Sequence, residues 1–204
     1  MNPVAEQTHL HHTTPMSSMV SLKNHFLIAM PALHDPNFNQ SISLICEHNE
    51  EGAMGVIINR QSDITVKEIV TQFSDNTRFA TEDDEHLYAF EGGPVYPQHG
   101  FVLHRNQGEW TYSLNISDEL TLTTSQDIMK AIGDNEGPDE YLIALGYAGW
   151  EAGQLEQEIS DNSWLTIPAC ADIVFHYPIS ERRSLAAIMN GINLEKLSSL
   201  AGHA

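Results

Sequence analysis

Basic residues are scarce in this sequence. Nine Lys and Arg stand against 28 Asp and Glu, which gives a formal net charge of −19 at pH 7. A field of this sign repels phosphate backbones and anionic lipid over a Debye length of about 8 Å at physiological salt. The best basic patch, Arg182 and Arg183, follows Glu181 and has no interleaved aromatics, so we interpret the pair as solvated surface charge. We therefore expect no nucleic-acid partner and no membrane partner.

Cysteines and long apolar runs are also few. Cys46 and Cys170 are the only cysteines, so the sequence offers no disulfide framework. The N-terminus lacks the charged segment and apolar block of a secretory signal. No apolar run approaches the roughly 18–20 residues that a membrane-spanning helix requires. These absences predict a cytoplasmic protein.

Motifs with a unique chemistry are missing as well. The histidines show no H-x-x-x-H spacing and the cysteines no C-x-x-C spacing, so we expect no metal site. There is no G-x-S-x-G sequence of the kind that carries a nucleophilic serine. The stretch "ALGYAGWEAGQLEQEI" (144–159) spaces its glycines as G-x-x-G-x-x-x-G, which is neither the dinucleotide nor the phosphate-loop pattern. We expect no cofactor, and we interpret these glycines as a tight turn between a strand and an acidic helix.

Apolar and alternating runs predict an extensive sheet. The expected strands are 26–30, 41–47, 52–59, 86–91, 100–105, 109–115 and 140–148. The expected helices are 65–73, 123–133, 151–159 and 180–191. Thr65 with Glu68 and Thr123 with Gln126 have capping-box spacing, and Ser180 is the expected cap of the last helix. The stripe of Leu185, Ile188, Met189 and Ile192 in that helix predicts a core-facing surface.

Residues 1–18 lack apolar periodicity, so we expect a disordered tail followed by one domain over 19–204.

One pair of residues could form a nucleophile and its base. Cys46 and His48 lie two apart on an expected strand, which predicts that they share a face. A thiolate and an imidazole act together only at hydrogen-bond distance and with a low thiol pKa. A cysteine inside "SLIC" is more typical of an inert buried residue.

Several longer segments resemble the bacterial AlgH/YqgE family in order and spacing. They are "KNHFLIAMPALHDPNF", "ICEHNEEGAMGVIINR", "EGGPVYPQHGFVLH", "LTTSQDIMKAI" and "ALGYAGWEAGQLEQEISDNSWL", with the terminal "AGHA". The likeness covers roughly residues 19–204, and it departs from the family pattern at "INRQS" and at Arg183, near where a Trp is common. What it implies is a single α+β domain, whose bifurcated mixed sheet folds into a pseudo-barrel with helices packed against it. It also implies a bacterial cytosolic protein with no established enzymatic activity.

Three functions from different classes follow from these observations. We favour a non-enzymatic module that binds a small ligand or a protein partner through loops at strand ends. The alternative is a hydrolase-like enzyme that uses Asp35, His99, or the Cys46 and His48 pair. A transcriptional regulator is the third, and both the charge and the missing helix-turn-helix pattern oppose it.

The expected binding loops are "PALHDPNF", "GGPVYPQHG" and "GYAGWEAGQ", because rigid sheets place their binding groups at such connections. If the loops converge, the ligand-binding residues are Asp35, His99 and Gln154 as polar contacts, with Tyr147 and Trp150 as an aromatic wall. The competing interpretation is that the aromatics plug the end of the sheet and the polar groups cap turns. The two differ in geometry: a binding site requires Asp35, His99 and Trp150 around one concavity.

Overall fold

The computed structural model describes residues 20–74, 77–78 and 86–194, so the tail expected over residues 1–18 lies outside the described residues. These residues form ten strands and five helices. The strands are β1 (His25–Ala29), β2 (Ile42–Asn49), β3 (Gly52–Ile57), β4 (Gln61–Thr65), β5 (Tyr88–Glu91), β6 (Val95–Arg105), β7 (Ser113–Asn115), β8 (Leu120–Thr123), β9 (Tyr141–Glu151) and β10 (Trp164–Pro168). The helices are α1 (Val66–Val70), α2 (Gln126–Gly133), α3 (Gln154–Ser160), α4 (Ala171–Phe175) and α5 (Arg182–Met189).

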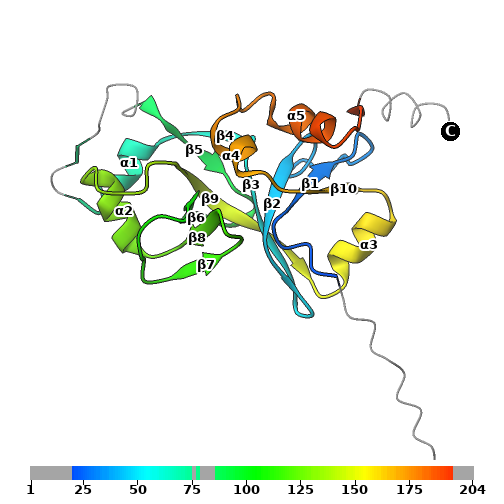
Figure 1. The fold of residues 1–204 in the computed structure, drawn as a ribbon, viewed down its shortest axis with the longest axis horizontal. Coiled ribbons are helices and arrows are strands. Elements are labelled where there is room, and N and C mark those ends of the chain that lie inside the picture. Colours follow the sequence, from blue (N-terminus) through cyan, green and yellow to red (C-terminus); the bar gives the residue numbers. More distant parts are fainter. Residues whose placement is uncertain (1–19, 75–76, 79–85, 195–204) are drawn as a thin grey trace, which may run out of the picture.

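Strand β9 joins the two parts of the sheet (Figure 1). Its last residues pair antiparallel with β3, from Ala148 to Glu151. Its earlier residues pair antiparallel with β6 and, at Ala144 and Leu145, parallel with β5. The strand order is β10-β1-β2-β3-β9-β6-β8-β7, and β4 joins the sheet through β5. The sheet curls into a half-barrel, so the expected single α+β domain is confirmed.

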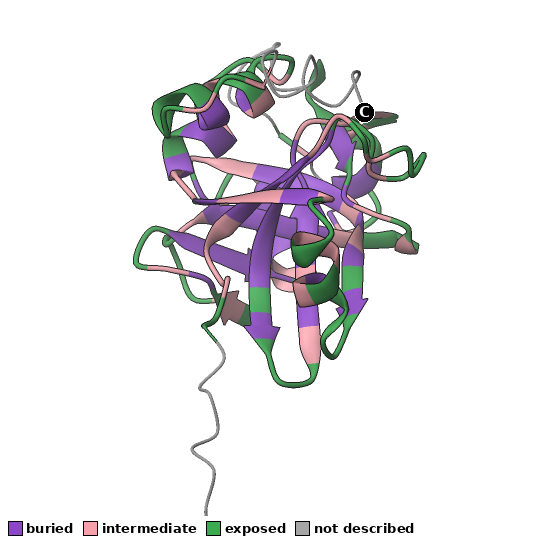
Figure 2. Ribbon diagram, turned by 90° about the vertical axis from the view of Figure 1, so that its right-hand side faces the viewer, coloured by how far each residue is buried: buried purple, intermediate pink, exposed green. Residues whose placement is uncertain are grey.

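Helices cover the curled sheet in three places (Figure 1). Helices α1 and α2 pack side by side over β6 and β9 through one apolar cluster that includes Val102 and Ile143. Helix α3 packs through Leu155 onto a second cluster around Trp150 and Trp164, while α4 and α5 close a third and larger cluster. The central strands are buried in Figure 2, and exposure is concentrated on loops and outer helix faces. None of the helices in the described ranges is long and apolar enough to cross a membrane.

The first helix begins where the sequence predicts. The hydroxyl of Thr65 accepts the backbone N–H of Glu68, and the Glu68 carboxylate accepts the backbone N–H of Thr65 at 2.8 Å. This capping box satisfies two backbone donors that the helix itself leaves free. Val66, Ile69 and Val70 then face the core, as the apolar spacing predicts.

The expected cap of α2 is wrong. Thr123 ends β8, and its hydroxyl contacts Nε2 of the buried His104 at 2.9 Å. Nδ1 of His104 lies 2.6 Å from the Arg105 carbonyl and so carries the proton, which leaves Nε2 to accept from Thr123. Burial lowers the pKa of His104, in keeping with a neutral ring. The N-cap is Ser125, two residues later than expected.

The last helix also differs from its prediction. It begins at Arg182 after Glu181, so Ser180 is not its cap. Ile188 and Met189 are 62% and 58% exposed, because the helix turns Arg182 and two alanines toward the core instead. Arg182 is therefore buried, and the interpretation of this arginine as solvated charge is wrong.

A network of ion pairs connects α4 to the end of β6. Arg105, at the end of β6, contacts Glu119 at 2.6 Å, Glu140 at 2.7 Å and Asp172 at 2.8 Å. Hydrogen bonds from Arg105 and then from His176 lower the pKa of Glu140. This arginine, unlike Arg182, has its charge matched by several carboxylates.

Candidate functional site

Asp35 organises a turn in the loop between β1 and β2. Its carboxylate accepts the backbone N–H of Asn37 at 2.7 Å, and its carbonyl accepts those of Phe38 and Asn39. This is the local hydrogen bonding that favours aspartate in turns. The sequence predicts that the Asp35 carboxylate contacts a ligand, and in the structure this carboxylate stabilises a turn.

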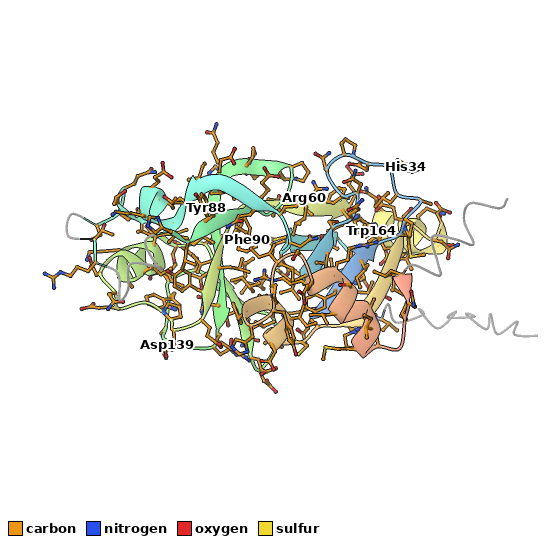
Figure 3. The ribbon with its side chains drawn as sticks, turned by 90° about the horizontal axis from the view of Figure 1, so that it is seen from above. His34, Arg60, Tyr88, Phe90, Asp139 and Trp164 are labelled. Carbon is orange, nitrogen blue, oxygen red and sulfur yellow. The ribbon has the colours of Figure 1, made fainter. Side chains whose placement is uncertain are left out.

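Arg60 fixes the same loop against the sheet (Figure 3). Its guanidinium donates to the carbonyl of Pro36 at 3.1 Å and to the carbonyl of Asn39 at 2.8 Å, with a further bond to the Asn39 side chain. The carbonyl of Arg60 accepts the backbone N–H of Glu91 on β5. One residue of "INRQS", a segment that carried no prediction of function, therefore holds two neighbouring segments together.

Close backbone contacts require glycine within the segment "ALGYAGWEAGQLEQEI". Gly146 has φ +72°, and a Cβ there would lie 2.4 Å from the carbonyl oxygen of Gly93. Gly93 in turn has φ +154° and would place a Cβ 2.2 Å from the backbone of Tyr147. The segment after β5 thus crosses β9 at a distance that only glycine permits. The expected loop "GYAGWEAGQ" is instead strand up to Glu151, and the helix begins at Gln154 rather than Glu151, after Gly153 at φ +77°.

His99 and Tyr147 belong to a row of aromatic rings on the sheet. The ring of Tyr147 lies 5.6 Å from that of Phe101 and 6.2 Å from that of Tyr96. The ring of His99 meets Tyr96 edge to face at 5.4 Å. The segment "GGPVYPQHG" is not a free loop, because β6 begins at Val95 and pairs with Tyr147 before it resumes at Gly100.

Trp150 and Gln154 serve the packing of α3. Trp150 is 5% exposed, and its Nε1 donates to Oε2 of Glu158 at 2.9 Å. The same oxygen accepts from Nε1 of Trp164 at 2.8 Å, while Phe38 stacks on Trp150 at 5.9 Å. The amide of Gln154 donates to the other Glu158 oxygen and accepts the backbone N–H of Glu151. Both predicted residues therefore have partners within the protein.

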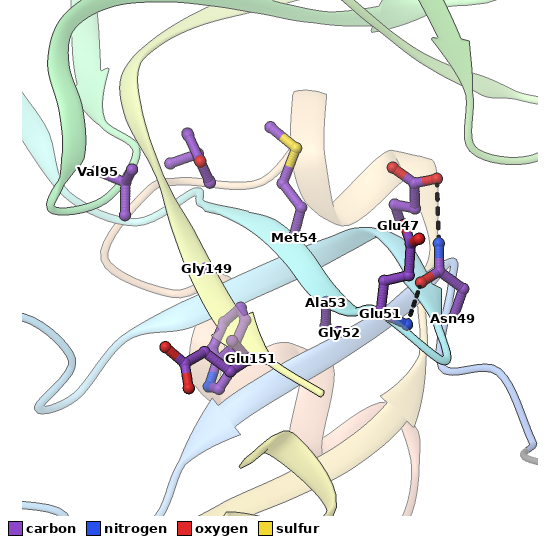
Figure 4. A pocket seen from close by; sticks show the side chains of 11 residues that line it. Glu47, Asn49, Glu51, Gly52, Ala53, Met54, Val95, Gly149 and Glu151 are labelled. Atoms are coloured by element: carbon purple, nitrogen blue, oxygen red, sulfur yellow. Dashed lines mark hydrogen bonds between the residues drawn. The ribbon is translucent and has the colours of Figure 1, made fainter. Parts of the chain in front are cut away.

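Two cavities adjoin these segments. The acidic cavity, of about 500 Å³, is lined by Tyr147 and Trp150 together with Glu47, Glu51 and Glu151 (Figure 4). Ala53, Met54 and Val95 add further apolar surface. Neither it nor the second cavity is lined by Asp35, His99 or Gln154. Of the five predicted site residues, the structure brings two to one cavity.

The second cavity, which we call the Arg60 cavity, has a volume of about 400 Å³. Two of the three predicted loops contribute to it, through Asn37 and through Gly93, Pro94 and Pro97. Its apolar surface is completed by Ile57, Ile64 and Leu145, and its polar groups are those of Arg60, Ser62, Asp63 and Glu91. No hydrogen bond or ion pair of the Asp63 or Glu91 carboxylate is found in the described part of the chain. Sequence reasoning missed both carboxylates, because Asp63 lies outside the quoted segments and Glu91 is the last residue of an expected strand.

The Cys46 and His48 pair does not form a catalytic dyad. The register of β2 against β3 shifts between Ile45 and Glu47, and this bulge breaks the alternation that would place both side chains on one face. Cys46 is fully buried in the large cluster, and burial raises the pKa of its thiol to about 12. His48 points instead to α3, where its Nε2 lies 2.8 Å from Glu156, and its Nδ1 accepts the backbone N–H of Leu22 at 2.8 Å. Among residues 20–74, 77–78 and 86–194, no group of three His, Cys, Asp or Glu is arranged to hold a metal ion.

Comparison with known proteins identifies relatives along nearly the whole chain. Residues 26–195 match a family model described as AlgH-like. A UPF0301 protein of Thioalkalivibrio sulfidiphilus is 47% identical over 189 residues, which are 93% of this chain and 100% of the relative. A UPF0301 protein of Nitrosococcus oceani is 46% identical with the same coverage. The names of these relatives state no activity.

Two solved structures share the fold. The solution structure of the AlgH protein from Pseudomonas aeruginosa matches with a TM-score of 0.73 and 46% identity, covering 96% of this chain and 100% of that one. The crystal structure of protein DIP2367 from Corynebacterium diphtheriae matches with a TM-score of 0.69 over 90% of this chain and 94% of that one. At 20% identity, the second likeness concerns the fold alone.

Proposed function

The chain belongs to the AlgH-like family, and we propose that it is a non-enzymatic module that binds a small organic molecule in the Arg60 cavity. The observation that carries this proposal is a cavity with fixed walls and two carboxylates, those of Asp63 and Glu91, that have no partner among the described residues. Its volume of about 400 Å³ lies in the usual range of roughly 300–1,000 Å³ for ligand pockets.

The walls of the cavity are held before any ligand arrives. Arg60 anchors the loop that carries Asn37, and the glycine crossing at Gly93 and Gly146 anchors the opposite wall. A preorganised wall lowers the conformational cost of binding. This supports a site for a small molecule rather than a surface that orders only on association.

The polar groups indicate the class of ligand. The carboxylates of Asp63 and Glu91 can accept hydrogen bonds from an amine, and Ile57, Ile64 and Leu145 can cover an apolar body. The guanidinium of Arg60 is already engaged by carbonyl groups. A small amine with an apolar part therefore complements this cavity best.

No observation favours the hydrolase among the described residues. The Cys46 thiol is buried with a raised pKa, the Asp35 carboxylate stabilises a turn, and His99 stacks on Tyr96. Acid–base catalysis needs a titratable pair within hydrogen-bond reach in a cleft, and none of these residues supplies one. The net charge of −19, the burial of Arg182 and the two free cysteines support our proposal of a cytoplasmic protein without a nucleic-acid partner.

The test is a thermal-shift screen of the full chain against small primary amines and uncharged metabolites, followed by calorimetry of the hits. We expect amine hits whose affinity falls by roughly tenfold or more in the double variant Asp63→Asn with Glu91→Gln, because both side chains keep their shape and lose their charge. The matched control is Glu51→Gln with Glu151→Gln, which removes two charges from the acidic cavity. Equal loss in both double variants, or no amine that shifts the melting temperature, contradicts the proposal.

A further inference from the structure

Arg182 is a buried cation at the start of α5. The residue is 6% exposed, although its side chain carries a full charge. Its Nε donates to the carbonyl of Tyr177 at 3.2 Å, and its Nη1 donates to the carbonyl of Ile58 at 2.5 Å. The guanidinium lies 5.1 Å from the centre of the Phe90 ring. These contacts hold the guanidinium through two carbonyl dipoles and an aromatic ring.

No carboxylate pairs with Arg182 in the part of the chain that the structure describes. This is unusual for a buried cation, because removing a charge from water is costly unless an opposite charge compensates it. Carboxylates are abundant in this chain, and Arg105 alone contacts three of them. Burial lowers the pKa of Arg182 to about 10, so the group still carries its charge at neutral pH.

Arg182 lines a cavity of about 210 Å³, which we call the Arg182 cavity. Its walls are mainly apolar and include Phe90, Val174, Phe175 and Ile179. A guanidinium has five N–H bonds, and the two hydrogen bonds above leave those of Nη2 without an acceptor among the described residues. The cavity therefore combines mainly apolar walls with a fixed guanidinium whose Nη2 has no acceptor among the described residues.

This cavity is distinct from the Arg60 cavity. Gln61 and Phe90 line the Arg182 cavity, while their neighbours Arg60, Ser62 and Glu91 line the other. Successive side chains of a strand point to opposite faces, so the ribbon of β4 and β5 separates the two cavities. Tyr88 and Phe90 are labelled on this ribbon in Figure 3.

We propose that the Arg182 cavity binds a small apolar monocarboxylate, aromatic or short aliphatic, whose carboxylate pairs with Arg182 and whose body packs on Phe90, Val174 and Ile179. The planar fork of arginine matches the two oxygens of a carboxylate. One buried positive charge is neutralised by a monoanion, whereas a phosphate dianion would leave an excess charge between apolar walls. The volume lies below the usual range for drug-sized ligands and restricts the occupant to a small molecule.

The experiment compares benzoate with benzamide, which has nearly the same shape and no charge, on the full chain. We expect benzoate to raise the melting temperature at millimolar concentration and to bind roughly tenfold or more tightly than benzamide. Arg182→Met should abolish the response to benzoate. Arg183→Met is the matched control, because Arg183 is half-buried, donates to the carbonyl of Ala29 and does not line the cavity.

A second variant keeps Arg182 intact, so that the test does not depend on whether Arg182→Met folds. Ile179→Trp fills the cavity from a half-buried position and should also abolish benzoate binding. Asp63→Asn with Glu91→Gln should leave benzoate binding unchanged, which separates this inference from the proposed function. The proposal is overturned if benzamide binds as well as benzoate, if Arg182→Met or Ile179→Trp retains binding, or if phosphate binds more tightly than any monocarboxylate.

Discussion

Asp127 connects the start of α2 to the segment before β7, and its replacement should weaken the fold in a pH-dependent way. Oδ2 of Asp127 accepts the backbone N–H and the hydroxyl of Thr111, at 2.8 Å and 2.7 Å. Oδ1 accepts the Ser125 hydroxyl at 2.5 Å and the backbone N–H of Ile128 at 2.8 Å. Asp127→Asn keeps the size of the side chain, but it removes the charge and one of the two accepting oxygens.

The magnitude follows from the pKa of this carboxyl group. Burial alone would raise the pKa of Asp127, but the hydrogen bonds from Ser125 and Thr111 outweigh it and lower the pKa from 3.8 to about 2. At about 1.4 kcal/mol per pKa unit, the charged form is stabilised by at most about 2.5 kcal/mol. The carboxylate is partly exposed to solvent, which screens the interaction, so we expect a loss of about 1 kcal/mol for Asp127→Asn at pH 7.

The sign of the pH dependence follows from the lowered pKa. A carboxyl group whose pKa is lower in the folded state contributes its full stability above its unfolded pKa, near 4. That contribution disappears as the pH falls from about 4 to about 2, where the group is protonated in both states. Asp127→Asn should therefore differ from the unmodified protein at pH 7 and converge with it in acid.

Urea denaturation between pH 7 and pH 2 measures this effect. The control is Asp118→Asn, because Asp118 is exposed and its carboxylate has no hydrogen bond or ion pair with a described residue. We expect a control change within about 0.5 kcal/mol at every pH. A loss for Asp127→Asn that stays constant as the pH falls, or an equal loss in the control, would refute the reasoning.

Three further predictions concern features elsewhere in the fold. Gly146→Ala should lower the free energy of unfolding, measured by urea denaturation, by about 3 kcal/mol, because its Cβ would meet a backbone oxygen. Gly191→Ala has a similar φ but open space around it, so it should lose about 1 kcal/mol. Equal losses would contradict the steric argument. Iodoacetamide should label Cys170 and not Cys46 in the native protein, as mass spectrometry can show, because the buried thiol has a pKa of about 12 and is not ionised; equal labelling would contradict it. Arg105→Met should lose about 1 kcal/mol of stability at low salt and less at 1 M NaCl, since its carboxylate partners are partly exposed; a salt-independent loss would contradict the electrostatic origin.

Elements with strong apolar periodicity could be predicted from the sequence. β1 and β9 contain continuous apolar runs, and α1 combines such spacing with a capping box. β4 was missed because "QSDIT" is polar and pairs with β5 at the margin of the sheet. β10 was missed because its five residues, "WLTIP", form only a short apolar run, and such a run does not distinguish a strand from a helix. Periodicity identifies an element only where one of its faces is consistently apolar.

The candidate site was harder to predict, because its geometry depends on irregular backbone. The bulge at Cys46 reverses the face on which His48 lies, and the glycine crossing turns an expected loop into a strand. Of the predicted site residues, Tyr147 and Trp150 line a cavity together, whereas Asp35, His99 and Gln154 line neither it nor the Arg60 cavity. Arg182 was misjudged because a local sequence cannot show that a charged residue will be covered by segments more than a hundred residues away, as its bond to Ile58 requires. Burial of this kind is a property of the tertiary structure alone.

The position of β9 in the sheet has a consequence for synthesis on the ribosome. β3 precedes β9 by almost a hundred residues, and β5 and β6, which also pair with β4 and β8, each have a second edge that pairs with β9. A nascent chain that has not yet released Glu151 therefore exposes the paired edges of three strands at once. Such long-range pairing delays folding and leaves strand edges open to association with other chains. We expect this protein to fold late, after most of its chain has left the exit tunnel, with the open edges of β3, β5 and β6 exposed until then.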